Sequence, residues 1–294
     1  MRVTELNMVN SFLNSVSTSR SKIDKLNLQI SSQKKINAMS DDPTGGASVL
    51  RLKDKVNQNE QYQSNITVAN AMMTTTADSL NAASDVFVRL KETLTRATSA
   101  TNSRDLAPFA GDVQQMFEEL LHISNTSFNG KFIFGGTQTK DQPFTYDAAT
   151  QTATANPNGV SGSIKLDVAP QIQEPTNISG EDAFNGNAAL NAVLNVYKAL
   201  SGGTQATAAD QQAVTDAMDR LMTVSVKAGT SLSRLDTFQT QLESQNTSLK
   251  SILSKVQDTD IAQAIVELQH QQTILDTSLK IGAQIIPKTL VDFI

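Results

Sequence analysis

The chain has 294 residues, a formal net charge of -5, only 5% aromatic residues and no tryptophan, so few bulky side chains are available to fill one thick globular core. Its 24 basic and 29 acidic residues are close to balance, which argues against nucleic acid as a partner because phosphate binding needs excess positive charge. The absence of cysteine excludes disulfides, thiolate metal ligands and cysteine nucleophiles.

Two kinds of targeting segment are missing from the sequence. The first 16 residues contain no apolar run of signal-peptide length, and nowhere do about 18 apolar residues follow one another. We therefore expect no membrane insertion. The protein is expected either to stay in the cytosol or to leave it by a route that uses no cleavable signal.

The N-terminal segment predicts a helix that ends near residue 36. Its apolar residues recur at spacings of three and four, which is typical of a heptad seam. Arg20 and Asn27 interrupt the pattern. A helix with such a stripe needs partner helices, so the stripe is a candidate subunit interface. Its members are Leu6, Val9, Leu13, Val16, Ile23 and Ile30.

A turn follows that contains Asp41, Asp42 and Pro43. The carboxylates can cap backbone N–H groups, and proline suits the first turn of a helix. The same two carboxylates could form an acid–base pair, but the adjacent proline and glycines favour capping. A second helix is then predicted to about residue 97, with a heptad stripe over roughly 45 residues.

The middle of the chain changes character. A third helix is predicted up to about residue 124, followed by a short strand that runs into a turn at Gly135 and Gly136. From 138 to 186, prolines, glycines and short β-prone runs predict a small β-rich domain inserted in a helical body.

Helices return after this insert. One is predicted from Asn187 to Leu200 and another from Asp210, with a heptad seam beyond Gly229. The last stretch, from Asp258 to residue 294, predicts a long helix with a second candidate interface stripe. This stripe contains Ile261, Ile265, Leu268, Gln272, Leu275 and Leu279, and the apolar ending adds Leu290, Phe293 and Ile294.

The predicted fold is mainly α, an elongated bundle of long antiparallel heptad helices formed by both chain ends, with a small β-rich domain inserted in the middle. We expect three parts. The terminal helices are 1-40 and 258-294, which are expected to be disordered in the monomer. The helical bundle is 41-137 with 187-257, and the inserted domain is 138-186.

No constellation of residues predicts catalysis, a cofactor site or a metal site. Glu119 and His122 have the spacing of half a carboxylate-bridged metal site, but no second such pair exists. Phosphate-loop and dinucleotide spacings are also missing. We therefore predict that the chain is not an enzyme, binds no cofactor, and pairs with other helices.

Three groups of residues together resemble the flagellin superfamily. The first group contains Ile30-Ser31-Ser32, Lys35-Ile36-Asn37 and Ser40-Asp41-Asp42-Pro43. The second is Gly130-Lys131-Phe132-Ile133-Phe134-Gly135-Gly136-Thr137. The third contains Asp258-Thr259-Asp260-Ile261-Ala262 and the ending Leu290-Val291-Asp292-Phe293-Ile294. Each piece is weak, but the combination is specific.

The resemblance implies a structural subunit of the bacterial flagellum, located outside the cell at the junction between hook and filament. It implies export through the flagellar apparatus with a cytosolic export chaperone. It also implies contacts with copies of the same chain in a ring, with hook-associated protein 1 and with flagellin. The terminal helices would form an inner tube, the long helices the next layer, and the β insert the outer surface.

Two other functions remain open at this point. A flagellin-type filament subunit would share the seams, but the Phe134-Gly135-Gly136-Thr137 turn and the modest insert argue against it. A cytosolic helical scaffold or the signalling rod of a receptor is the other. The lack of a membrane span weakens the receptor version.

Overall fold

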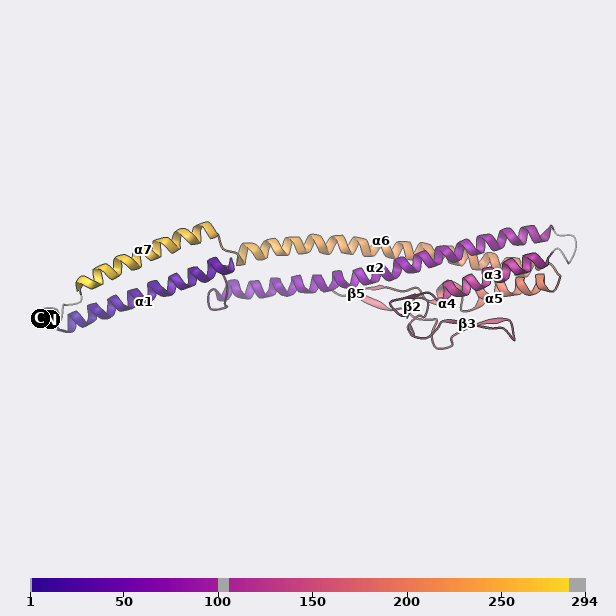
Figure 1. Cartoon of the computed structure of the whole chain (residues 1–294), viewed down its shortest axis with the longest axis horizontal. Helices are drawn as coiled ribbons and strands as arrows, with labels where there is room; N and C mark the ends of the chain where they lie inside the picture. Colours follow the sequence, from indigo (N-terminus) through magenta and orange to yellow (C-terminus); the bar gives the residue numbers. More distant parts are fainter. Residues whose placement is uncertain (1, 100–105, 286–294) are drawn as a thin grey trace. The chain divides into compact units, whose positions relative to one another are not determined.

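The computed structural model describes residues 2–99 and 106–285, with side chains from residue 7 to residue 283 (Figure 1). Its helices are α1 Arg2–Ser32, α2 Pro43–Thr98, α3 Ala107–Ser124, α4 Gly180–Phe184, α5 Ala188–Ser201, α6 Ala208–Gln257 and α7 Ile261–Ile285. Its strands are β1 Ser127–Phe128, β2 Lys131–Phe132, β3 Phe144–Asp147, β4 Thr152–Ala155, β5 Lys165–Ala169 and β6 Ile172–Pro175. The prediction of a mainly α chain with long helices at both ends and strands in the middle is confirmed.

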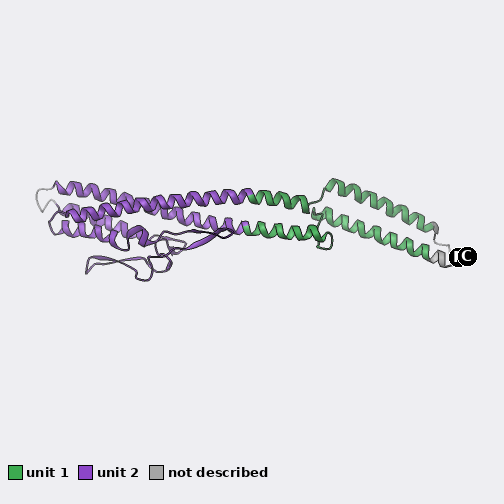
Figure 2. Ribbon diagram, turned by 180° about the vertical axis from the view of Figure 1, so that it is seen from behind, with its two compact units in different colours: residues 1–58, 245–294 green, residues 59–244 purple. Residues whose placement is uncertain are grey.

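The chain divides into two compact units, one made of residues 1–58 and 245–294 and the other of residues 59–244 (Figure 2). The first contains α1, α7 and the adjoining ends of α2 and α6. The second contains the remaining helices and all the strands of the described chain. The three-part division expected from the sequence stays a prediction.

The heptad stripe of α2 forms part of the core of the 59–244 unit. Side chains seven residues apart are at most 5% exposed, and they are Ile66, Met73, Leu80, Phe87 and Leu94. From Met73 onward these side chains belong to one apolar cluster with α3, α5 and α6. This heptad spacing therefore marks a side of α2 that packs on its own chain, as expected.

α6 runs without a break through Gly229, the residue beyond which the heptad seam was predicted. A methyl group added at Gly229 would meet no atom within 4 Å, so the residue lies on an open side of the helix. One glycine in a helix interior costs about 1 kcal/mol relative to alanine. Burial of neighbours such as Val224 and Leu235 outweighs that cost.

The strands form three separate antiparallel pairs, β1–β2, β3–β4 and β5–β6. Asn129 and Gly130 connect β1 to β2 with φ values of 50° and 73°, as a type I′ hairpin turn requires. The β-prone runs between 138 and 186 predicted strands in the region of β3 to β6, whereas this Asn-Gly hairpin lies before that region and was not predicted.

The strand segment packs on the helices of its own unit. The rings of Phe134 and Phe144 meet the ring of Phe184 edge-to-face, with centroids 5.2 and 5.4 Å away. Asn125, at the end of α3, accepts a hydrogen bond from the Phe144 N–H at 3.1 Å and donates to the Phe144 carbonyl at 3.0 Å. The strand segment is also joined to α6, because the buried Glu174 carboxylate of β6 pairs with Arg234.

The turn predicted at Gly135 and Gly136 is enclosed by the chain. Gly136 has a φ of 58°, and a methyl group added there would lie 2.0 Å from the Ser161 carbonyl oxygen. The buried Asn177 side chain donates to the Gly136 carbonyl at 3.2 Å and accepts from the Ile164 N–H at 2.7 Å. Only glycine fits this left-handed position beside another stretch of backbone.

Candidate functional site

The terminal helices α1 and α7 lie side by side in the 1–58 and 245–294 unit (Figure 2). Their covered positions alternate at spacings of three and four, which defines a heptad seam. On α1 the covered positions are Val9, Phe12, Val16, Ser19, Ile23, Leu26 and Ile30. On α7 they are Ala264, Leu268, Gln271, Leu275, Ser278 and Gly282.

The structure brings together about half of the residues predicted as interface candidates. Val9, Val16, Ile23, Ile30, Leu268 and Leu275 lie in the seam. Leu13, Ile261, Ile265, Gln272 and Leu279 are exposed. The side chain of Leu6 and all of Leu290, Phe293 and Ile294 lie outside the described residues.

The observed seam differs from the predicted stripe at every second position. At these positions the covered residue is the one immediately before the residue expected from the sequence. Phe12 takes the place expected for Leu13. Ser19 and Leu26 occupy the positions where Arg20 and Asn27 seemed to interrupt the N-terminal pattern. On α7, Ala264 and Ser278 face α1 in place of the larger neighbours Ile265 and Leu279, and Gln271 faces it in place of Gln272.

Exposed apolar residues of α7 lie on both flanks of its seam, and Val266, 67% exposed, projects to the side opposite the seam. At 100° per residue, Ile261, Ile265 and Leu279 project roughly a quarter turn to one side of the seam, and they are 39%, 41% and 42% exposed. Ile274 and Ile281, 37% and 51% exposed, project to the other side. Exposed apolar stripes of this kind gain free energy when other surfaces cover them. We call the first group flank A and the second flank B.

A backbone clasp holds α1 and α7 together where they join the rest of their unit. The Lys35 N–H donates to the Gln257 carbonyl at 2.7 Å, and the Thr259 N–H donates to the Gln33 carbonyl at 3.1 Å. Gln33, with a φ of 59°, ends α1 in the left-handed conformation common just beyond helix ends. At the start of α7, the Asp260 carboxylate accepts from the Gln263 N–H at 3.1 Å and so caps the helix.

Asp41 and Asp42 both bind backbone N–H groups of the loop between α1 and α2. Asp42 accepts from Thr44 and Gly45 and so caps α2. Asp41 accepts from Ala38 and Asn37 at 3.0 and 3.1 Å and pairs with Lys25 of α1 at 3.1 Å. The Ala38 N–H first, and then Lys25, lower the pKa of Asp41 below its usual value. The two carboxylates hold a loop and do not form an acid–base pair.

Acid is expected to loosen this loop. Because the pKa of Asp41 is lowered by folding, its contribution to stability is present above the ordinary aspartate value of about 4 and is lost as the pH falls through the lower folded-state pKa. The Asn37 and Ala38 amides should therefore lose protection from hydrogen exchange in acid, measured relative to the exchange rate of an unstructured peptide at the same pH. Asp41→Asn should show the faster exchange already at pH 7, whereas Asp54→Asn on α2 should not. Equal protection in Asp41→Asn and the parent would contradict this role.

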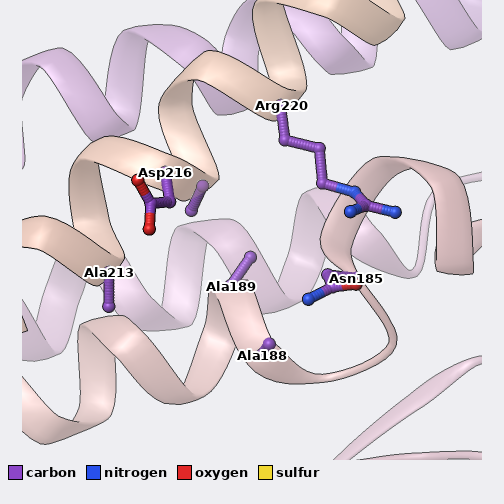
Figure 3. Close-up of a pocket in the computed structure, with 7 residues that line it drawn as sticks. Asn185, Ala188, Ala189, Ala213, Asp216 and Arg220 are labelled. Atoms are coloured by element: carbon purple, nitrogen blue, oxygen red, sulfur yellow. The ribbon is translucent and has the colours of Figure 1, made fainter.

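The polar residues around one pocket of the 59–244 unit, and Glu119 on α3, are engaged in hydrogen bonds and ion pairs within the chain. The pocket in Figure 3 is lined by four alanines together with Asn185, Asp216 and Arg220. Arg220 donates to the Asp182 and Glu181 carbonyls at the end of α4, and Asp216 accepts from Gln212. Glu119, considered above with His122, pairs with Arg89 at 2.6 Å.

Residues 2–99 and 106–285 lack both a metal-binding cluster and a membrane-spanning helix. These residues contain no group of three His, Cys, Asp or Glu side chains placed to hold a metal ion. None of their helices is long and apolar enough to cross a membrane.

Comparison with known families decides what kind of protein these helices belong to. Residues 3–139 match the bacterial flagellin N-terminal helical region, and residues 211–294 match the bacterial flagellin C-terminal helical region. The chain belongs to the flagellin family. The predicted superfamily is thereby confirmed, and the chain belongs to a family of structural proteins of the bacterial flagellum.

Within the flagellin family, the chain is similar to two kinds of protein. It is 24% identical to flagellar hook-associated protein 3 of Salmonella typhimurium over 95% of both chains. It is 23% identical to flagellin of Listeria innocua over 87% of this chain and 85% of that one. The structure of FlgL from Bacillus cereus, 19% identical, superimposes on 69% of this chain and 99% of its own with a TM-score of 0.60, which shows a common fold.

Proposed function

We propose that this chain is a structural subunit of the bacterial flagellum that forms the junction between hook and filament. The match to hook-associated protein 3 carries the proposal, because it extends over 95% of both chains. The site agrees with an assembly role, since its main feature is a helix pair with uncovered apolar flanks and it offers no reaction chemistry. A family of flagellar structural proteins gives no reason to expect an enzyme.

Flanks A and B support packing of copies in a ring. If α7 needed only one partner helix, it would have only one apolar face, and α1 already covers the seam face of α7. Apolar residues on both sides of that seam suit a helix with a neighbour on each side. In this proposal flank A contacts one adjacent copy and flank B contacts another, so the terminal helices together build an inner tube. Hook-associated protein 1 and flagellin are the proposed partners on either side of the ring.

The proposed route to the junction is export by the flagellar apparatus, in an unfolded state and with the help of a cytosolic export chaperone. The final location would be outside the cell. The match to flagellar hook-associated protein 3 of Salmonella typhimurium over 95% of both chains supports this route.

A deletion strain tests the function against its nearest alternative. If the chain joins filament to hook, cells without it should carry hooks that lack filaments, while flagellin is still secreted into the medium as monomer. The alternative is a filament subunit, which the match to Listeria innocua flagellin favours. In that case the deletion would remove the flagellin itself. Filaments still attached to hooks would contradict the junction proposal.

The free subunit is expected to have labile ends. The seam between α1 and α7 contains polar or small residues such as Ser19, Gln271 and Ser278, so in the free subunit this helix pair should form but open locally more often than the 59–244 unit does. Limited proteolysis of the monomer should remove both ends and leave a core of about residues 45 to 255. Terminal helices that resist protease in the monomer would contradict this expectation.

A further inference from the structure

One contact in the terminal helix pair joins two residues that are singular in the sequence. Phe12 is the only aromatic residue before Tyr62, and Gly282 is the only glycine after Gly229. A methyl group added at Gly282 would lie 2.1, 2.5 and 2.6 Å from three carbon atoms of the Phe12 ring. The ring therefore packs directly on the backbone of α7, and any larger residue at position 282 would force the ring to shift.

The contact lies far along the helices from the backbone clasp. The clasp pairs Lys34 with Asp258, and Phe12 and Gly282 are 22 and 24 residues away from it along the two helices. The chain connects α1 to α2 and α6 to α7 at the clasp end. Away from the clasp, the described residues of the two helices contact each other through side-chain packing, to which polar seam positions such as Gln271 and Ser278 contribute little.

We infer that the Phe12–Gly282 contact holds the ends of α1 and α7 remote from the clasp together within one subunit. Glycine lets the two backbones approach, and the ring fills the gap that results. The inference concerns the isolated chain. Its consequence for assembly, that the contact aligns flanks A and B for neighbouring copies, rests on the proposed function.

Replacement of Gly282 by alanine gives a test in which two effects have opposite signs. Alanine is the better helix former, by about fivefold in the equilibrium between helix and coil. If nothing filled the space at residue 282, Gly282→Ala would strengthen α7. If the Phe12 ring fills it, the added methyl group must displace the ring and separate the helices. Gly229→Ala is the matched control, because its added methyl group meets no atom within 4 Å.

Cysteine cross-linking measures the separation directly, because the chain has no cysteine of its own. In the purified full-length monomer, Val16→Cys with Ser278→Cys reports on the seam near the contact. Ile30→Cys with Ala264→Cys reports on the seam near the clasp. Gly282→Ala and Phe12→Ala should each lower the rate of disulfide formation at the first pair about fivefold or more. The rate at the second pair should stay within twofold of the parent.

Two further controls make the result specific. Leu13→Ala changes the residue next to Phe12 but outside the seam, and neither it nor Gly229→Ala should alter either rate. An unchanged thermal unfolding transition of the 59–244 unit shows that each variant is folded. The inference is overturned if Gly282→Ala and Phe12→Ala cross-link the first pair as fast as the parent does. Because the assay uses monomers, its outcome is independent of whether the chain is located at the junction.

Discussion

Replacing Ile265 and Leu279 together by aspartate is expected to leave cells with hooks that carry no filaments. Both side chains belong to flank A and are about two-fifths exposed in the subunit. In the proposed ring each would lose the burial of its remaining exposed two-fifths, about 1 kcal/mol, and each new carboxylate would have to be desolvated without a partner. The loss repeats at every contact between copies. Swimming in soft agar and electron microscopy of detached flagella measure the result.

A matched variant separates this interface effect from a general effect of charge on α7. Gln269 and Thr273 are exposed on the side of α7 opposite its seam, and Gln269→Asp with Thr273→Asp adds the same two charges there. This control should retain much more swimming than the flank A variant. Both proteins should melt like the parent, because the changed residues lie outside the 59–244 unit. Normal filaments on cells with the flank A variant would show that flank A is not an interface.

Gly136→Ala is expected to have the largest effect on stability of any single methyl addition considered. The left-handed backbone costs a non-glycine residue about 1–2 kcal/mol, and the new methyl group would lie 2.0 Å from the Ser161 carbonyl oxygen and 2.8 Å from its nitrogen. Moving the Ser161 backbone would also disturb the hydrogen bonds of Asn177. We expect a total loss of about 3 kcal/mol or more, which for a unit of this size lowers the melting temperature by about 10 °C.

Gly130→Ala is the control for the backbone contribution alone. Gly130 also has a positive φ, 73°, but a methyl group added there would meet nothing within 4 Å. Its substitution should cost only the conformational part, about 1–2 kcal/mol. Thermal or urea unfolding of the two variants measures the difference. If both lose the same stability, the close approach of Ser161 to Gly136 has no energetic importance.

The long heptad stripe of α2 shows what periodicity can predict. Ile66, Met73, Leu80 and Phe87 are large and apolar and recur every seven residues, so the pattern alone identifies the side of the helix that packs on the chain. The Gly135-Gly136 turn could be predicted because adjacent glycines indicate a special backbone conformation. Its enclosure by Ser161 and Asn177 depends on residues distant in the sequence and could not be.

The terminal helices show where the same method fails. On α7 the most hydrophobic stripe includes Ile261, Ile265 and Leu279, whereas the helix pairs with α1 through smaller or more polar residues. Hydrophobicity ranks leucine above serine and glycine, but close helix approach favours small residues. The sequence therefore predicted the long terminal helices correctly, and the interface between subunits stays a prediction. It could not show that Gly282 faces Phe12 and that flank A stays uncovered.

Labelling the protein on intact cells tests the central proposal most directly. With an epitope in the β3–β4 loop near Ala149, which is exposed, immunogold electron microscopy should place the label in a narrow band between hook and filament. Cells that lack the chain should show no label. Label distributed along the whole filament would indicate a filament subunit, and label confined to the cytoplasm would contradict an external junction role.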